Sequence, residues 1–176
     1  VTPYAAPLRS ILSNFSATPL ATSSDRERYL HALPKVATLL TAMETKLRGQ
    51  AERGIVLPAA EFDLVLPYLE SYAGQGRSPF VPSAERLSAL PADVRASFAE
   101  AATKIASTEI APALDRLRSY VSGAYRDKAA ADVGIGHYPG GDRFYRFLVR
   151  YHTGRDLTPE AIHQLGLDEV ARLEQA

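Results

Sequence analysis

Three of the four histidines lie close together in this 176-residue chain, and imidazole is both a common acid–base group and a common zinc ligand. They are His137, His152 and His163. The metal-binding helix of many zinc enzymes needs the pattern His-Glu-x-x-His, because two imidazoles one turn apart bind the metal while the glutamate activates water. No histidine here is followed by glutamate. The spacing therefore predicts no zinc site, and a three-histidine site is the lesser alternative because it depends wholly on the fold.

A glycine-rich turn precedes His152, between Gly134 and Gly141, and invites comparison with a phosphate-binding loop. A dinucleotide fingerprint needs glycine where Pro139 stands and a strand before the turn, and neither is present. No Gly-Lys-Ser/Thr follows. The glycines instead favour positive φ and close backbone approach. We expect a structural turn, with Asp142 capping the helix after it.

The helix predicted at 143–152 carries an apolar stripe and a basic ridge. Four apolar side chains fall within about 100° of one another at helical spacing, which predicts that they pack into the core: Phe144, Phe147, Leu148 and Tyr151. The ridge consists of Arg143, Arg146 and Arg150. Such a ridge is typical of a solvated helix face. The alternative is that it binds a carboxylate, of this domain or of a substrate, through bidentate contacts.

A second helix is predicted after this one. Thr153-Gly154 ends the first helix, and Thr158-Pro159-Glu160 supplies a hydroxyl cap, a proline at the first helical position and an acid near the positive end of the dipole. Its buried side is expected to comprise Ile162, Leu165, Val170 and Leu173.

The upstream segments that must position these residues also show helical periodicity. Ser24-Asp25-Arg26-Glu27 predicts a capping box, and Pro34 predicts a kink or break in the helix that follows. A long helix is expected from Pro91, bent at Pro112, after an internal loop at Gly74–Pro79. No segment alternates convincingly between apolar and polar residues. The class is therefore all-α, an irregular array of kinked helices in a single domain at 1–176.

Charge and composition exclude several functions. Lys+Arg and Asp+Glu both number 20, so the net charge is zero, which argues against nucleic acid or an anionic membrane as the main partner. No apolar run approaches about twenty residues, so no membrane span is expected. The chain contains no cysteine, which excludes disulfides but does not fix the compartment. Because the sequence starts at Val1 and stops inside a helical pattern, we expect a piece of a longer polypeptide; the alternative is a complete small protein.

Several residue patterns, most of them near the C-terminus, can be compared with known families. They are Tyr138-Pro139-Gly140-Gly141-Asp142, Phe144-Tyr145, Leu148, Arg150-Tyr151-His152-Thr153 and Asp156-Leu157-Thr158-Pro159-Glu160, with Ile162, His163, Leu165, Gly166, Leu167, Glu169 and Val170, and upstream Arg53-Gly54-Ile55-Val56-Leu57-Pro58 and the segment around Tyr4 to Pro7. Together they resemble the bacterial domain-of-unknown-function 885 family. The resemblance covers most of the chain and is specific in about the last forty residues.

The resemblance implies a mostly helical fold and a zinc metallopeptidase of the zincin type. In that family a His-Glu-x-x-x-Gly-His-like element lies well downstream of the Thr-Pro-Glu helix, and many members are exported or lipid-anchored. The present sequence stops before that element, so no metal ligand or catalytic residue can be assigned to it. The resemblance thus implies zinc in a longer protein, a downstream catalytic half as partner, and a peptide substrate.

Two functions follow as hypotheses. In the first, the chain is a helical scaffold of a zinc-dependent peptidase, inactive alone, whose cleft is approached by a set of substrate-binding residues: His137, Tyr138, Gly140, Gly141, Tyr145 and Arg146. In the second, it is a stand-alone helical binding module. Fully buried apolar faces would favour the second, whereas a large exposed apolar patch would mark where further chain or a partner packs.

Overall fold

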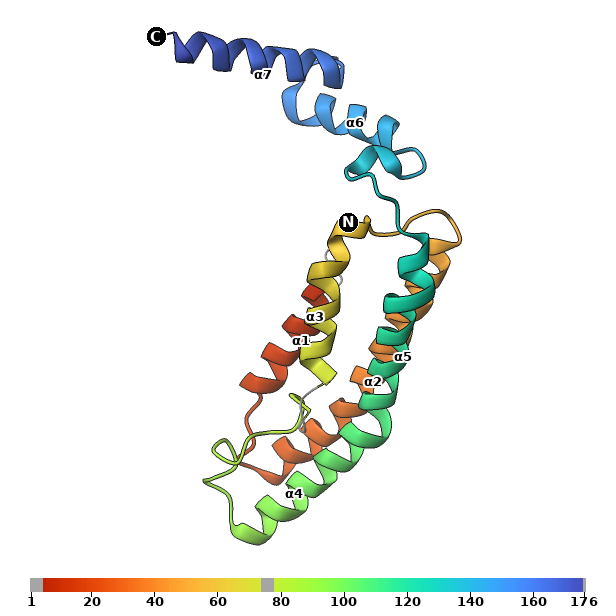
Figure 1. Ribbon diagram of the computed structural model, residues 1–176. Helices are drawn as coiled ribbons and strands as arrows, with labels where there is room; N and C mark the ends of the chain where they lie inside the picture. The colour runs from red at the N-terminus through yellow and green to blue at the C-terminus, as the bar shows by residue number, and fades with distance from the viewer. Residues whose placement is uncertain (1–4, 74–77, 176) are drawn as a thin grey trace.

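A computed structural model describes residues 5–73 and 78–175, and within them the chain is helical without a β-strand (Figure 1). The predicted all-α class is confirmed, while the predicted loop at Gly74–Pro79 lies largely outside the described residues. The helices are α1 Ala5–Ala17, α2 Ser23–Ala51, η1 Ala59–Glu61, α3 Phe62–Ala73, α4 Ala92–Ile105, η2 Ala106–Ile110, α5 Ala111–Tyr120, η3 Val121–Tyr125, η4 Arg126–Lys128, η5 Ile135–His137, α6 Gly141–Thr153 and α7 Pro159–Glu174.

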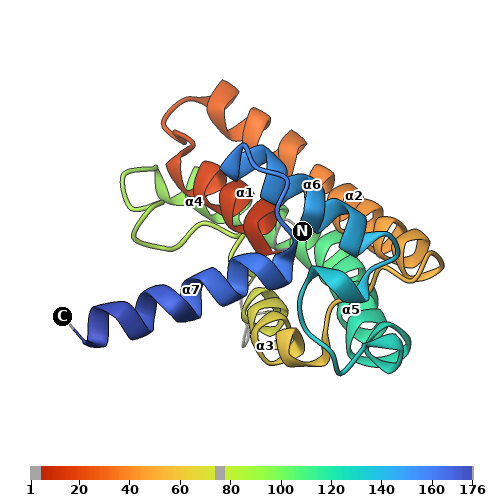
Figure 2. The same cartoon turned by 90° about the horizontal axis from the view of Figure 1, so that it is seen from above.

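The first five α-helices form an elongated bundle, with α2 packed along α5 and α3 against the same helix. Their apolar stripes meet in one core, whose most deeply buried members include Leu33, Leu40, Phe62, Ala102, Leu117 and Tyr125. Helices α6 and α7 lie beyond one end of this bundle, and α7 runs out past its outline (Figures 1 and 2). We call α6 and α7 the arm. No described helix is long and apolar enough to span a membrane.

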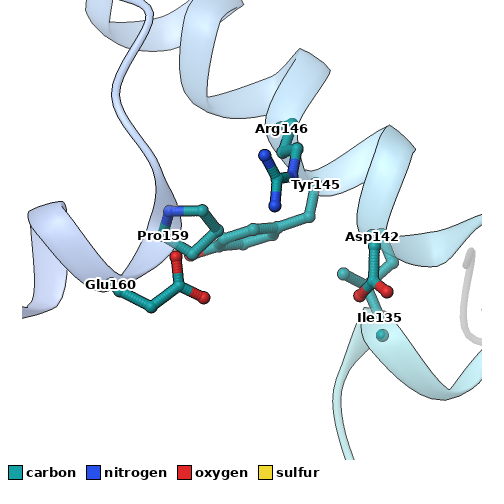
Figure 3. Close-up of a pocket in the computed structure, with 7 residues that line it drawn as sticks. Ile135, Asp142, Tyr145, Arg146, Pro159 and Glu160 are labelled. Carbon is teal, nitrogen blue, oxygen red and sulfur yellow. The ribbon is translucent and has the colours of Figure 1, made fainter.

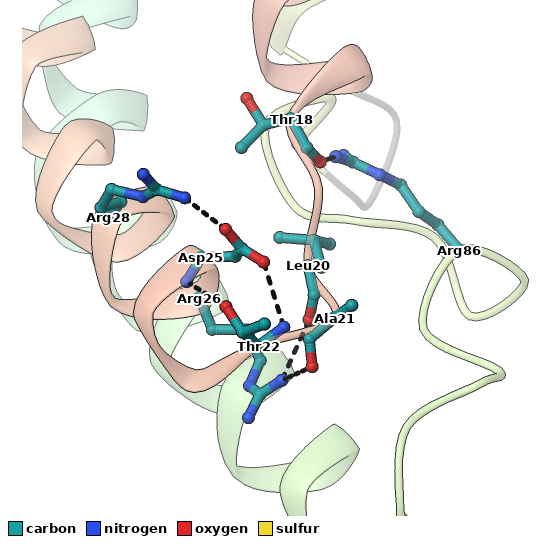
Figure 4. A network of polar contacts seen from close by, with 8 residues as sticks. All are labelled: Thr18, Leu20, Ala21, Thr22, Asp25, Arg26, Arg28 and Arg86. Atoms are coloured by element: carbon teal, nitrogen blue, oxygen red, sulfur yellow. Dashed lines mark hydrogen bonds and ion pairs between the residues drawn. The ribbon is translucent and has the colours of Figure 1, made fainter.

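The start of α2 is capped by Thr22, not by the predicted Ser24. The Thr22 hydroxyl accepts a hydrogen bond from the Asp25 N–H at 3.1 Å, and the Asp25 carboxylate accepts one from the Thr22 N–H at 3.1 Å (Figure 4). Asp25 also pairs with Arg28. The same hydroxyl-and-acid pattern occurs at Thr22–Asp25 and Ser24–Glu27, and the earlier one prevails because Asp25 gains this second partner.

Removing the charge of Asp25 should flatten the pH dependence of stability. Hydrogen bonds from Thr22, together with Arg28, hold the Asp25 pKa below its ordinary 3.8. A lowered folded-state pKa stabilises the fold above the unfolded-state pKa, and this contribution is lost as pH falls through the folded pKa. Asp25→Asn keeps the oxygen acceptor but loses this contribution.

The measurement is urea unfolding from about pH 7 down to about pH 3. We expect the wild-type chain to lose more stability over this range than the Asp25→Asn variant. Arg28→Gln serves as a control that removes the ion pair and leaves the cap, and it should fall between them. Parallel pH profiles for wild type and Asp25→Asn would contradict the prediction.

Proline does not end either long helix. Helix α2 passes through Pro34 from Ser23 to Ala51, because the buried residues Leu33 and Val36 on either side hold it against the bundle. Ahead of Pro112 the chain adopts the π-helical turn η2, where the wider backbone accommodates a residue without an N–H. The expected break at Pro34 is thus absent, and the irregularity expected at Pro112 is a π turn preceding it.

The apolar stripe of α6 is not part of the core, contrary to the prediction. Phe147 and Tyr151 are 57% and 72% exposed, Phe144 is half exposed and only Leu148 is partly buried. In α7 the expected inward residues Leu165, Val170 and Leu173 are likewise exposed, with Ile162 intermediate. Helical periodicity predicts which face is apolar, but it cannot say whether another element covers that face.

The ends of the arm helices agree with the sequence more closely. Thr158 caps α7 by accepting from the Ala161 N–H at 3.2 Å, and Gly154 ends α6 with a positive φ of 65°. Asp142, however, lies in the first turn of α6 and does not cap it. The cap position is taken by Gly140, whose φ of 74° is accessible to glycine without strain.

Candidate functional site

The turn that leads into α6 contains glycines at positions that other residues could not easily occupy. Two of them have a backbone conformation that is rare for other residues, and a third leaves no room for a side chain. Gly134 and Gly140 have φ values of 96° and 74°. A Cβ on Gly141 would lie 1.8 Å from the carbonyl oxygen of Ile135. Gly141 donates its N–H to the Tyr138 carbonyl at 2.8 Å. The turn therefore closes on itself by direct backbone contact, as the glycine content predicted.

The turn is attached to the bundle at the loop that follows α2. The Pro139 ring packs over Gly54, where an added Cβ would meet the Pro139 Cγ at 3.4 Å. The His137 imidazole contacts the Gly134 carbonyl through Nδ1 and approaches the Val56 carbonyl at 3.4 Å through Nε2. His137 thus bridges turn and bundle through carbonyl oxygens.

The Tyr138 ring lies against the His137 ring at a tilt of 42°, with ring centroids 3.7 Å apart. Burial raises the pKa of the Tyr138 phenol, and the nearby Glu61 carboxylate adds to the shift. The phenol is protonated at neutral pH even at its ordinary pKa of 10.0, and both effects extend that state to higher pH. Together, His137 and Tyr138 fix the position of the turn.

A cavity of about 400 Å³ opens where the turn, α6 and the start of α7 meet (Figure 3). The Arg146 guanidinium, the Tyr145 ring and the Glu160 carboxylate are drawn close to one another there, while Asp142 lies beside Ile135. The lining residues are Ile135, Gly136, Asp142, Tyr145, Arg146, Pro159 and Glu160.

The charges of this cavity are mixed. The pKa of Glu160 is held below its ordinary value, chiefly by its own backbone N–H at the start of α7, then by the Thr158 hydroxyl and by Arg146. Glu160 is therefore a carboxylate at neutral pH. One guanidinium and two carboxylates face a phenol, an arrangement that can donate and accept hydrogen bonds with a polar ligand. No serine, cysteine or histidine is among these lining residues, so the cavity provides no Ser–His or Cys–His pair.

The structure brings only part of the predicted residue set to the cavity. Tyr145 and Arg146 line it, whereas His137, Tyr138, Gly140 and Gly141 build the turn behind it. Sequence reasoning missed Asp142, Pro159 and Glu160 as lining residues. The Thr158-Pro159-Glu160 pattern was identified only as a helix start, and the local pattern does not show that the Pro159 and Glu160 side chains reach a cavity.

The described residues do not fit a zinc ion. No group of three or more histidine, cysteine, aspartate or glutamate side chains within 5–73 and 78–175 could hold a metal. His137, His152 and His163 are thus not gathered into a site.

Comparison with known proteins gives a family and a fold. A family model described as "Bacterial protein of unknown function (DUF885)" matches residues 1–176. The chain is similar in fold to a crystal structure of "the putative lipoprotein from Colwellia psychrerythraea", with a TM-score of 0.75 and 24% sequence identity. The match covers 94% of this chain and 29% of that one, so the chain spans less than a third of that protein. No curated protein matches it.

Proposed function

The chain belongs to the DUF885 family of bacterial proteins, and from that membership we propose that it is the helical scaffold of a zinc-dependent peptidase. It forms one wall of the substrate cleft in a longer polypeptide. The sequence motifs that resemble zincin-type members support the peptidase class. The observation that carries the role of this chain is the cavity lined by Tyr145 and Arg146. No catalytic residue or metal ligand is assigned to it.

The cavity chemistry suits a peptide better than a phosphorylated ligand. A peptide presents both N–H donors and carbonyl acceptors, which carboxylates and a guanidinium can respectively bind. Asp142 and Glu160 together outweigh the single positive charge of Arg146, so a phosphate would meet net repulsion. The ring of Tyr145 adds a flat apolar surface for a side chain.

The longer protein is proposed to be exported or lipid-anchored. This rests on the lipoprotein description of the structurally similar protein and on the many exported members of the family. The alternative of a stand-alone binding module is less well supported, because the arm leaves large apolar side chains uncovered.

Arg146 provides the test of the proposed cleft. In the longer polypeptide, Arg146→Gln should raise KM for a peptide substrate about tenfold, the loss expected for a hydrogen bond to a charged group. Zinc content should not change, because Arg146 is not a ligand. Arg95→Gln, on α4 within the bundle, is the matched control and should leave KM unchanged.

The measurement is peptide hydrolysis by the longer polypeptide, with metal content determined on the same preparation. A longer polypeptide that binds no zinc and cleaves no peptide would refute the peptidase proposal. If the Arg146→Gln enzyme were active with an unchanged KM, the cavity would not be part of the substrate-binding cleft.

A further inference from the structure

The arm presents an ordered apolar face to solvent. On α6, the rings of Phe144, Phe147 and Tyr151 follow each other along one side, with centroids 6.2 and 6.0 Å apart. All three are at least half exposed. On α7, four apolar side chains are more than half exposed: Leu165, Leu167, Val170 and Leu173. Scattered exposed apolar residues are ordinary, whereas a row on one helix followed by four more exposed apolar side chains on the next marks an interaction surface.

The pattern of α6 is that of a helix meant to be covered. Its aromatic side chains recur at i, i+3 and i+7, the spacing by which α2 buries Leu33, Val36 and Leu40 in the bundle. In α2 this stripe meets α5, while in α6 only Val149 and Gly141 are buried. The same periodicity therefore has a packing partner in one helix and none among the described residues in the other.

A basic ridge runs beside this aromatic row. Arg143 and Arg150 lie one residue before Phe144 and Tyr151, hence about 100° around the helix from them. Neither arginine forms an ion pair among the described residues. The surface that covers α6 should thus be apolar where it meets the rings and carry carboxylates along one edge.

The length of the structurally similar protein identifies the occupant. Nearly all of this chain superimposes on 29% of that one, so the same helical fold occurs within a polypeptide more than three times as long. An anionic membrane surface is disfavoured, because the acids of α7 offset the arginines of α6 and the arm has no net positive charge. Further helices of one polypeptide can cover both arm helices at once.

We propose that the apolar face of the arm is a docking surface for further helices of the same polypeptide, in a protein longer than these 176 residues. The inference rests on the proposed function for the existence of that longer chain. It does not require the longer chain to be a peptidase. The partner surface is apolar opposite Phe147 and Val170 and acidic opposite Arg143 and Arg150.

The absence of cysteine allows a direct test. The single variants Phe147→Cys and Val170→Cys each place one thiol on the arm, where its labelling rate measures how accessible that position is. The control is Ser97→Cys, at an exposed position of α4, which lies at the end of the bundle away from the arm (Figure 1). Thiol labelling rates are followed by peptide mass spectrometry in the 176-residue chain and in the longer polypeptide. Circular dichroism checks that each variant keeps its helix content.

We expect labelling at positions 147 and 170 to slow about tenfold or more in the longer polypeptide, with position 97 unaffected. Equal rates in both proteins would overturn the proposal, as would a natural gene product no longer than 176 residues. If labelling at positions 147 and 170 of the 176-residue chain slowed as its concentration rose, a second copy of the chain would be the partner that covers this face. Protection only by phosphatidylglycerol vesicles would assign it to a membrane. Protected thiols in a longer polypeptide without zinc or hydrolysis would leave the docking surface standing and refute the peptidase.

Discussion

Replacing Phe62 with alanine should lower the free energy of unfolding by about 3 to 5 kcal/mol. Phe62 is fully buried at the start of α3, and its ring centroid lies 5.9 Å from that of Tyr125. The Tyr125 hydroxyl in turn accepts the Leu57 N–H at 3.2 Å, which ties the loop after α2 to the same place. The substitution leaves a cavity that α3, held on α5, cannot easily close.

The same substitution on the arm provides the control. Phe147→Ala removes an equally large ring that is 57% exposed, so the free energy of unfolding of the 176-residue chain should change by no more than about 0.5 kcal/mol. Both values come from chemical denaturation followed by circular dichroism. Similar losses for the two variants would show that the arm is packed in solution, against the exposure described above.

Replacing Gly141 with alanine should destabilise the start of α6 by about 1 to 3 kcal/mol. The added Cβ would meet the Ile135 carbonyl oxygen at 1.8 Å, and this neighbour is backbone that cannot rotate away. The turn must therefore open, and the hydrogen bond from the Gly141 N–H to Tyr138 is expected to break. Amide hydrogen exchange in the first turn of α6 should accelerate.

Gly49→Ala is the matched control for this second prediction. Gly49 lies within α2, and a Cβ there would meet nothing within 4 Å. Because alanine favours the helix over glycine, the substitution should be neutral or stabilise α2 by up to about 1 kcal/mol. Unchanged exchange at α6 in the Gly141→Ala variant would contradict the close packing of the turn.

The sequence predicted the local features of the fold better than its packing. The caps at Thr158 and Gly154 depend on residues within one turn, so they could be recognised from the sequence. The choice of Thr22 over Ser24 turned on a contact with Arg28, and the persistence of α2 through Pro34 turned on burial against other helices. The Asp25–Arg28 contact lies within one turn of α2 but involves a third side chain, and the burial of α2 depends on other helices; the spacing of the cap residues and the proline specifies neither.

The lining of the cavity depends on tertiary structure in the same way. Tyr145 and Arg146 were expected at a cleft, and both line the cavity. Glu160 and Pro159 join them only because the chain turns between α6 and α7, which local pattern does not specify. The substrate-binding role itself stays a prediction until peptide binding is measured.

The π turn η2 keeps the long helix from α4 to α5 in register with its neighbour. Residues buried along this helix recur every four positions, and in a straight α-helix each such step rotates the buried point by about 40°. Over four steps the last side chain would face nearly the opposite side from the first. The wider π turn absorbs part of that drift, so one continuous rod presents an unbroken inner edge to α2: Phe98, Ala102, Ala106, Ile110 and Leu114. Loss of a single residue within 106–110 would let this segment wind as a regular α-helix, yet the downstream half and the arm it carries would keep nearly the same orientation, because four α-helical residues turn the chain by about as much as five π-helical ones.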